Sequence, residues 1–243
     1  MKSLKTKGIV LNQFKYSESS IIVNILTEEQ GKMSFIVNGV RKKKSKFPAN
    51  YFQAFNILQI VYLQSSKSDL HKIIEINSEA VLNDIIFDIY KSSMCMFLSE
   101  IINITHNTAE RDPKLYIFLE QLIQYIDAAL TEEIANIHIW TLLRLMQFNG
   151  ISPENNFSDS QIFFNPVEGN FTSNQQKNAY IYSRSQSLVI HQLLISTIEE
   201  ASNIEIHRIE RSDLLKLMVQ YFQLHIEGFR ASKSLDILSE IFE

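Results

Sequence analysis

Hydrophobic and polar residues alternate over much of the first third of the chain, a pattern typical of short, half-buried β-strands. Met33, Phe35 and Val37 share one face of a strand that follows a glycine-containing turn. Apolar, β-branched runs at residues 8–11, 20–26 and 57–63 predict three more strands, and alternation over residues 72–76 predicts a fifth: no helix of convincing length separates them.

Five short strands within about 75 residues favour a small closed or nearly closed barrel. The leading prediction is a five-stranded oligonucleotide-binding (OB) barrel. An SH3-like barrel is the alternative, and counting strands leaves both architectures open.

From residue 79 onward the apolar spacing becomes helical, with apolar residues three and four positions apart. A first helix is expected over about residues 79–104. Asp112 followed by Pro113 is an N-cap signal that starts a second helix, and Thr131 is expected to cap a third. Residues 151–183 are rich in Asn, Ser and Gln and predict a β-turn between two short extended pieces, after which helical patterns resume.

These patterns predict an α+β fold of two domains: an OB barrel over residues 1–77 and an all-helical domain over residues 78–243 that carries the insert at about 151–183.

The balance of positive and negative residues changes at the same boundary. The net charge is −4, but residues 1–77 hold 12 Lys and Arg against 5 Asp and Glu, whereas residues 78–243 hold 11 against 22. Such asymmetry suggests a polyanionic partner for the basic part. Chance segregation and attraction between the two parts are the alternatives.

The strongest chemical feature is the basic loop, residues 41–46, which follows the third predicted strand. It places five positive charges in six residues: Arg41, Lys42, Lys43, Lys44 and Lys46. Ammonium groups are almost never buried unpaired, so packing does not account for them. A phosphate backbone removes their mutual repulsion and releases its own condensed counterions. A solvated surface loop and a localisation signal are the alternatives.

Further cations and aromatic rings extend this candidate DNA-binding surface. The cations lie on neighbouring predicted strands and turns and are expected to lengthen the cluster into a stripe: Lys5, Lys7, Lys15 and Lys32. Bases stack on aromatic side chains with little sequence preference, at about 1–3 kcal/mol each. Three rings flank polar turns or the basic loop and are the stacking candidates: Tyr16, Phe47 and Tyr51. Most other rings in this region, including Phe35 and Phe55, are expected in the core.

Residue counts and missing motifs exclude several classes of site. Cys95 is the only cysteine, so we expect a reducing compartment, no internal disulfide and no four-cysteine zinc site. The sequence has no signal-peptide core and no apolar stretch of membrane length, which predicts a cytoplasmic protein without a membrane partner. It also lacks a phosphate-cradling glycine loop, a nucleophile elbow and a metal-binding His pair. We therefore expect no catalytic residues, no cofactor and no metal, in a protein that is not an enzyme.

Five segments of the first 55 residues carry a resemblance to a known family: Lys7–Leu11, Tyr16–Ser20, Leu26–Lys32, Asn38–Lys46 and Tyr51–Phe55. Their order resembles the opening of the RecO family of DNA repair and recombination mediators, in the Bacteroidetes form that lacks zinc-ribbon cysteines. The resemblance is good over about residues 5–76, and beyond that helix order and chain length support it.

The resemblance implies an N-terminal OB barrel, a helical C-terminal domain and an insert that is a zinc ribbon in many members. It implies binding of single- and double-stranded DNA and annealing of complementary strands. It also implies that the protein works with RecR to help RecA replace single-strand-binding protein, and that it binds the acidic C-terminal tail of that protein. A bacterial cytoplasmic, nucleoid-associated location follows from the same resemblance.

Two positions depart from the family pattern. Ala54 stands where the family usually has proline, and the ribbon region has no cysteine, although residues 165–171 keep a turn-like sequence. We therefore predict no zinc in the insert. The histidines lack ligand-like spacing and are expected on the surface or in helix packing: His106, His138, His191, His207 and His225.

A site for the protein tail needs an apolar slot for a terminal Phe and a cation for its carboxylate. The third predicted helix offers Trp140, Leu143 and Arg144, with Gln147 nearby. We predict the tail site there, with a plain core role for Trp140 as the alternative.

The leading hypothesis is a nucleic-acid chaperone, because strand annealing needs a positive surface and no covalent chemistry. A second hypothesis is an adaptor whose basic barrel docks on an acidic protein without nucleic acid. A third is a hydrolase with an unrecognised site, which turnover of a nucleotide substrate would reveal.

Overall fold

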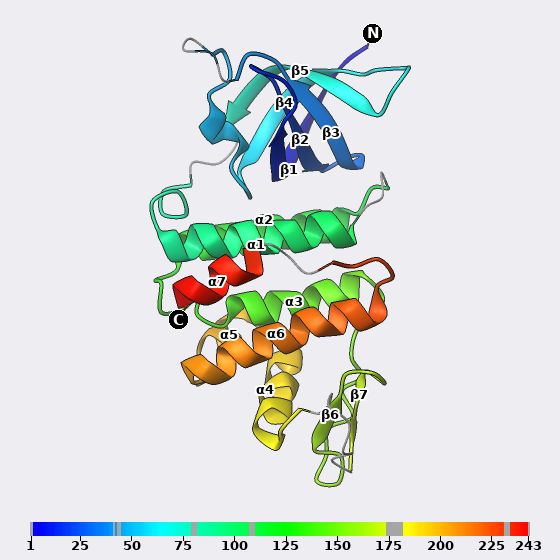
Figure 1. The fold of residues 1–243 in the computed structure, drawn as a ribbon, viewed down its shortest axis with the longest axis vertical. Helices are drawn as coiled ribbons and strands as arrows, with labels where there is room; N and C mark the ends of the chain where they lie inside the picture. The colour runs from blue at the N-terminus through cyan, green and yellow to red at the C-terminus, as the bar shows by residue number, and fades with distance from the viewer. Residues whose placement is uncertain are drawn as a thin grey trace. The chain divides into compact units, whose positions relative to one another are not determined.

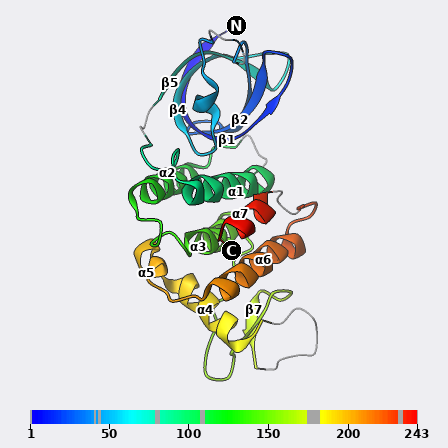
Figure 2. The same cartoon turned by 60° about the vertical axis from the view of Figure 1, so that its left-hand side comes forward.

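The computed structural model describes residues 2–40, 42, 45–78, 82–106, 110–173, 182–230 and 234–242. They divide into two compact units, residues 1–128 and residues 129–243 (Figures 1 and 2). Strand β5 (Leu70–Ser78) ends one residue after the predicted boundary at residue 77, whereas the first compact unit continues through helices α1 (Ile89–Thr105) and α2 (Pro113–Ala128). We retain residues 1–77 as the proposed extent of the DNA-binding domain.

Strands β1 to β5 close into a barrel (Figure 2). The order of the strands around it is β1-β2-β3-β5-β4. Neighbouring strands pair antiparallel, except that β3 pairs parallel with β5. Inward-facing apolar side chains fill the barrel, with Phe35 and Ile60 fully buried. The predicted five-stranded OB barrel is therefore confirmed. The elements of the barrel are β1 Ser3–Lys15, β2 Ile21–Thr27, β3 Gly31–Val37, the 3-10 helix η1 Ala49–Phe52, β4 Ile57–Leu63 and β5 Leu70–Ser78.

The first helix, α1 (Ile89–Thr105), begins later than its apolar spacing predicts. Asp88 is its N-cap, and the carboxylate of Asp127 accepts the backbone N–H groups of residues 83–85, which holds them in turns. Ile86 and Ile89, two of the apolar residues within the predicted helix, are 41% and 61% exposed. The two carboxylates fix a boundary that the apolar pattern does not show, because side-chain capping competes with helix propagation.

The second helix, α2 (Pro113–Ala128), begins at its predicted cap. The backbone N–H of Leu115 donates to the Asp112 carboxylate at 3.0 Å, and Pro113 occupies the first helical position. A proline is favourable there because the first N–H groups of a helix lack partners within the helix.

The second unit contains helices and one short hairpin that falls within the predicted insert. Its elements are α3 Ile137–Phe148, β6 Phe163–Asn165, β7 Asn170–Thr172, α4 Arg184–Ile195, α5 Ile198–Ser202, α6 Arg208–His225 and α7 Ser234–Phe242. Thr131 was predicted to cap helix α3, but residues 131–136 form turns and the helix begins at Ile137. Asn136, at the start of α3, instead donates its amide to the carbonyls of Ala201 and Ile204 at 3.1 and 2.7 Å. Within the described ranges, no helix combines the length and the apolar character needed to cross a membrane.

Candidate nucleic-acid interface

The barrel core anchors the basic loop on both sides. Val40 and Phe47 are 5% and 7% exposed and belong to the apolar cluster inside the barrel. Gly39 has a φ of +77°, which suits glycine, and its carbonyl accepts the backbone N–H of Lys42 at 3.1 Å. Phe47, expected to stack on bases, is instead a core residue that fixes the end of the loop.

Two of the five cations of the basic loop lie in the described residues. The side chain of Lys42 is exposed. The Nζ of Lys46 donates to the carbonyl of Ile74 at 2.7 Å and lies 5.2 Å from the centroid of the Phe47 ring. Ile74 is skipped in the register between β4 and β5, so Lys46 ties the loop to a bulge in β5. The other three cations lie outside the described residues: Arg41, Lys43 and Lys44.

The turn between β1 and β2 is joined to the residues that lead into the basic loop. The Ser20 hydroxyl donates to the Asn38 side chain at 3.0 Å, and the Ser20 N–H donates to the Ser17 hydroxyl at 3.2 Å. Tyr16 lies in this turn and is 58% exposed, and Lys15 before it is exposed as well. The structure thus brings Tyr16 and Lys15 close to the start of the loop.

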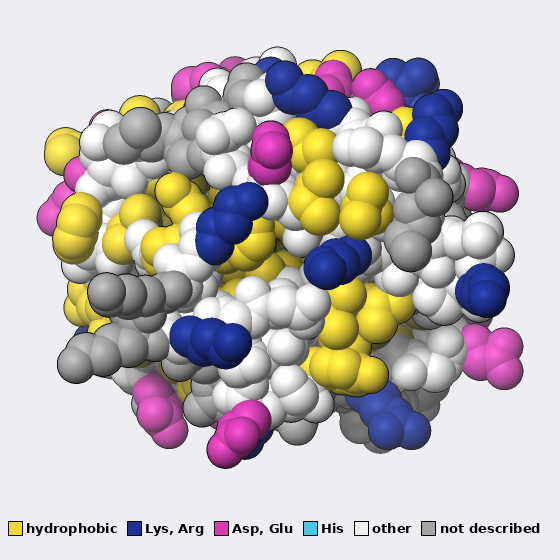
Figure 3. All heavy atoms as spheres, turned by 90° about the horizontal axis from the view of Figure 1, so that it is seen from above, with side chains coloured by type: hydrophobic (Ala, Val, Ile, Leu, Met, Phe, Trp, Pro, Cys, Tyr) yellow, Lys and Arg dark blue, Asp and Glu magenta, His cyan; other side chains and the backbone are white. Residues whose placement is uncertain are grey.

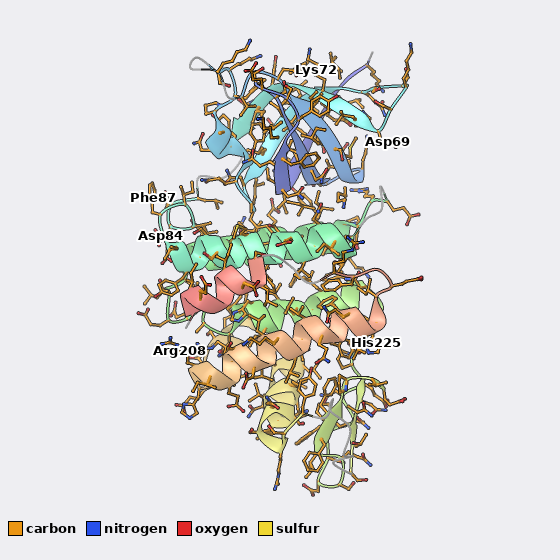
Figure 4. All side chains as sticks on the ribbon, in the orientation of Figure 1. Asp69, Lys72, Asp84, Phe87, Arg208 and His225 are labelled. Atoms are coloured by element: carbon orange, nitrogen blue, oxygen red, sulfur yellow. The ribbon has the colours of Figure 1, made fainter. Side chains whose placement is uncertain are left out.

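A row of side chains crosses the outer surface of four strands. Phe14 pairs with Ile22, Ile22 pairs with Ile36, and Ile36 pairs with Lys72. Cross-strand partners point to the same side of a sheet, and the residues next to the two isoleucines are buried in the core, so the row faces outward. We call these four residues the Phe14 row. Lys72 is labelled at the top of Figure 4, and the view from above in Figure 3 shows Lys and Arg side chains spaced among exposed apolar ones.

Phe14 and Lys72 were missed as site residues by the sequence analysis. In a regular strand Phe14 would share a face with Val10, which lies in the barrel core. Leu11 is skipped in the register with β2, and this bulge reverses the alternation beyond it. Phe14 therefore faces outward and is 49% exposed. A hydrophobic pattern carries no sign of such a bulge.

The remaining predicted residues of the barrel lie apart from the Phe14 row. Lys5 and Lys7 project from the part of β1 that pairs with β4, where Lys5 is exposed and Lys7 is half-buried. Tyr51 is half-buried and packs against the barrel core. These three residues remain predictions for DNA contact.

The carboxyl end of helix α1 is bonded to outward-facing side chains of β2 and β3. The Nζ of Lys32 donates to the carbonyl of Asn103 in the last turn of α1 at 2.7 Å. The amide of Asn24 donates to the Asn103 side chain at 3.4 Å, and the Ser34 hydroxyl donates to Asn24 at 2.7 Å. Burial lowers the pKa of Lys32. The carbonyls at the end of a helix carry partial negative charge, so the Lys32 ammonium stabilises the contact with α1. A phosphate would have to compete with the Asn103 carbonyl for this ammonium group.

His106 follows α1, and its imidazole is uncharged near neutral pH. Its Nδ1 lies 3.0 Å from the Thr105 hydroxyl, and its buried Nε2 has no hydrogen-bond partner among the described residues. Burial lowers the pKa of His106 to about 4; the Asp112 carboxylate opposes this shift, and the Lys32 ammonium adds to it.

We therefore expect the free energy of unfolding to fall as the pH drops from 6.5 toward 4, because the unfolded chain binds a proton at His106 that the folded chain does not. Urea unfolding near neutrality and near pH 5 measures this loss. The loss should be smaller in H106Q, whose side chain does not titrate. His138, whose pKa burial also lowers, is present in both proteins and cancels in the comparison. An equal loss in both would contradict the assignment.

The residues predicted for tail binding hold the end of α4. The Trp140 indole N–H donates to the carbonyl of Ser196 at 3.1 Å. The Arg144 guanidinium donates to the carbonyls of residues 193, 194 and 196 and lies 4.9 Å from the Trp140 ring. Leu143 is fully buried. A carboxylate binding to Arg144 would have to displace these carbonyls, so the tail site remains a prediction.

Aromatic packing holds the insert hairpin. The Phe164 ring is fully buried, 5.2 Å from the rings of Phe171 and Tyr182 and 6.1 Å from that of Tyr221. A Cβ at Gly169 would lie 2.8 Å from the Tyr221 hydroxyl, so glycine lets the turn approach α6. Over the described ranges, no group of three or more His, Cys, Asp and Glu residues is placed to hold a metal ion. The hairpin thus has a core made of aromatic rings.

Histidines of the second unit take part in this packing. His191 stacks on Phe157 with ring centroids 4.5 Å apart, and its Nδ1 lies 2.8 Å from Asn155 Oδ1. The Nε2 of His225 lies 2.7 Å from the carbonyl of Pro166 at the hairpin turn (labelled in Figure 4). Packing roles for these two histidines agree with the sequence analysis.

Comparison with known proteins covers nearly the whole chain. The profile of the family described as "Recombination protein O N terminal" matches residues 1–80, and that described as "Recombination protein O C terminal" matches residues 86–234. The "DNA repair protein RecO" of Flavobacterium johnsoniae is 31% identical over 240 residues, which is 98% of this chain and 99% of that protein. The proteins of the same name from Phocaeicola vulgatus and Bacteroides fragilis are each 31% identical, covering 98% of this chain and 98% and 99% of their own lengths.

Proposed function

The chain belongs to the RecO family, and from this premise we propose that it is a DNA-binding recombination mediator that is not an enzyme. It binds single- and double-stranded DNA, anneals complementary strands and helps to load a recombinase during recombinational DNA repair. The observation that carries this proposal is the OB barrel that anchors the basic loop and presents the outward-facing Phe14 row. An OB barrel commonly binds oligonucleotides.

Annealing follows from electrostatics without covalent chemistry. Two DNA strands repel each other through their phosphates, and a cationic surface screens that repulsion while leaving base edges free to pair. Lys42, Lys46 and Lys72 are exposed on the barrel and supply part of such a surface. The acidic residues of the chain are concentrated after residue 77, which leaves the barrel sequence basic.

The proposed partners are DNA, RecR and the acidic C-terminal tail of single-strand-binding protein, in the bacterial cytoplasm at the nucleoid. Arg144 is the proposed cation for the tail carboxylate, with Trp140 and Leu143 as its apolar neighbours. Binding there requires the guanidinium to exchange its α4 carbonyls for the carboxylate.

Titration of labelled single-stranded and duplex DNA with the full chain at several salt concentrations tests the proposal. The logarithm of the binding constant should fall linearly with the logarithm of the salt concentration, by about 0.7 per phosphate contact on a single strand. Association with an acidic protein that survives nuclease, without DNA binding, would support the adaptor hypothesis instead.

A further inference from the structure

We propose that the Phe14 row binds unpaired bases, and that it makes the barrel bind single-stranded DNA more tightly than duplex of the same length. The inference rests on the proposed DNA binding and adds to it the strand type and the residues that select it.

The exposed rings are the first argument. Phe14 and Tyr16 are 49% and 58% exposed on the barrel and its first turn. An exposed ring offers a base its flat face for stacking. Single-stranded DNA exposes base faces, whereas a duplex buries them in its own stack.

The geometry of the row is the second argument. Ile22 and Ile36 continue the apolar surface from Phe14, and Lys72 ends it. Four neighbouring strands spaced about 4.8 Å apart make this surface about 14 Å wide. Lys72 at the end of the row gives a phosphate backbone that follows it a cation to meet, while its bases rest on apolar side chains. Lys15 pairs with Ile21, which lies in the barrel core, so its side chain points to the opposite side of β1 from Phe14.

The position of α1 limits the path. Asn24 and Lys32, which would extend the face along β2 and β3, are bonded to Asn103 at the carboxyl end of α1. Partial negative charge at a helix carboxyl end repels phosphate, so that half of the face is unfavourable for a DNA backbone. The open path leads across the Phe14 row toward Tyr16 and the basic loop, and it is short enough for only a few unpaired nucleotides.

The test compares alanine variants of the full chain on labelled oligothymidylate and on a duplex of equal length. F14A and Y16A should each lower the affinity for oligothymidylate by roughly fivefold or more, which corresponds to one lost base stack. Their affinity for the duplex should stay close to that of the wild type. K72A should lower both affinities, because it removes a phosphate contact. F87A is the matched control, since Phe87 is an aromatic side chain 86% exposed outside the barrel (labelled in Figure 4).

A second measurement uses F14W, which keeps an aromatic face at the same position. Single-stranded DNA should quench its added tryptophan fluorescence, whereas duplex should not. Unchanged binding of oligothymidylate by F14A and Y16A, or an equal loss on both kinds of DNA, would overturn the inference while leaving the proposed function intact. Failure of the wild-type chain to bind any DNA would overturn the proposed function itself.

Discussion

Simultaneous replacement of Arg41, Lys42, Lys43 and Lys44 by alanine is expected to weaken DNA binding by roughly a hundredfold at moderate salt, without changing sequence preference. Each lost phosphate contact should also flatten the dependence of affinity on salt by about 0.7 in the log–log slope on a single strand. Fluorescence anisotropy with labelled single-stranded DNA at several salt concentrations measures both effects. The reason is that the variant neutralises fewer phosphates than the wild type, so its binding releases fewer condensed counterions from the DNA.

The matched control removes the same number of positive charges elsewhere. K114A, R208A, K216A and R230A together replace four exposed cations that lie after residue 77 (Arg208 is labelled in Figure 4). This variant should bind DNA nearly as the wild type does, because the proposed phosphate contacts lie on the barrel and its basic loop. Equal weakening in both quadruple variants would mean that net charge, rather than the loop, controls binding.

Replacing Phe164 by alanine is expected to lower the free energy of unfolding by about 3–5 kcal/mol, because its ring fills the centre of the insert and its contacts bridge to α6. The backbone N–H of Phe164 donates a hydrogen bond to the Ser187 hydroxyl at 2.8 Å. This bond does not involve the ring and remains in the variant, so the difference reports on the ring alone. Urea denaturation of wild type and variant gives the difference.

V167A is the control for this experiment, because Val167 is 50% exposed at the turn of the same hairpin and should change stability by no more than about 0.5 kcal/mol. A metal chelator should leave the melting temperature of the wild type unchanged, since aromatic packing holds the hairpin. A melting temperature lowered by chelator, or a Phe164 variant as stable as V167A, would contradict this account of the insert.

The barrel could be predicted from the sequence because successive side chains of a strand point to opposite faces, so alternating apolar residues mark the buried face. Met33, Phe35 and Val37 alternate with Ser34, Ile36 and Asn38, and the first three lie inside the barrel. The basic loop was equally visible, because unpaired charge has no place in a core. Asp112 and Pro113 marked the start of α2 through chemistry local to the chain.

The details of the surface depended on contacts between residues far apart in the sequence. The bulge at Leu11 turned Phe14 outward, and no local pattern encodes it. Lys32 and Arg144 carry charge that the sequence alone assigns to solvent or ligand, yet each donates to the carbonyl end of a helix. Asp127 fixes turns more than 40 residues earlier in the chain. Tertiary partners of this kind decide which cations and rings remain available.

Photo-crosslinking tests most directly whether the barrel carries the DNA site. A halogenated single strand is irradiated with the full chain, and the crosslinked peptides are identified by mass spectrometry. Crosslinks should fall within residues 14–22, 36–46 and around Lys72. Crosslinks confined to residues 78–243 would contradict the account, since they would place the DNA on the acidic helical part of the chain.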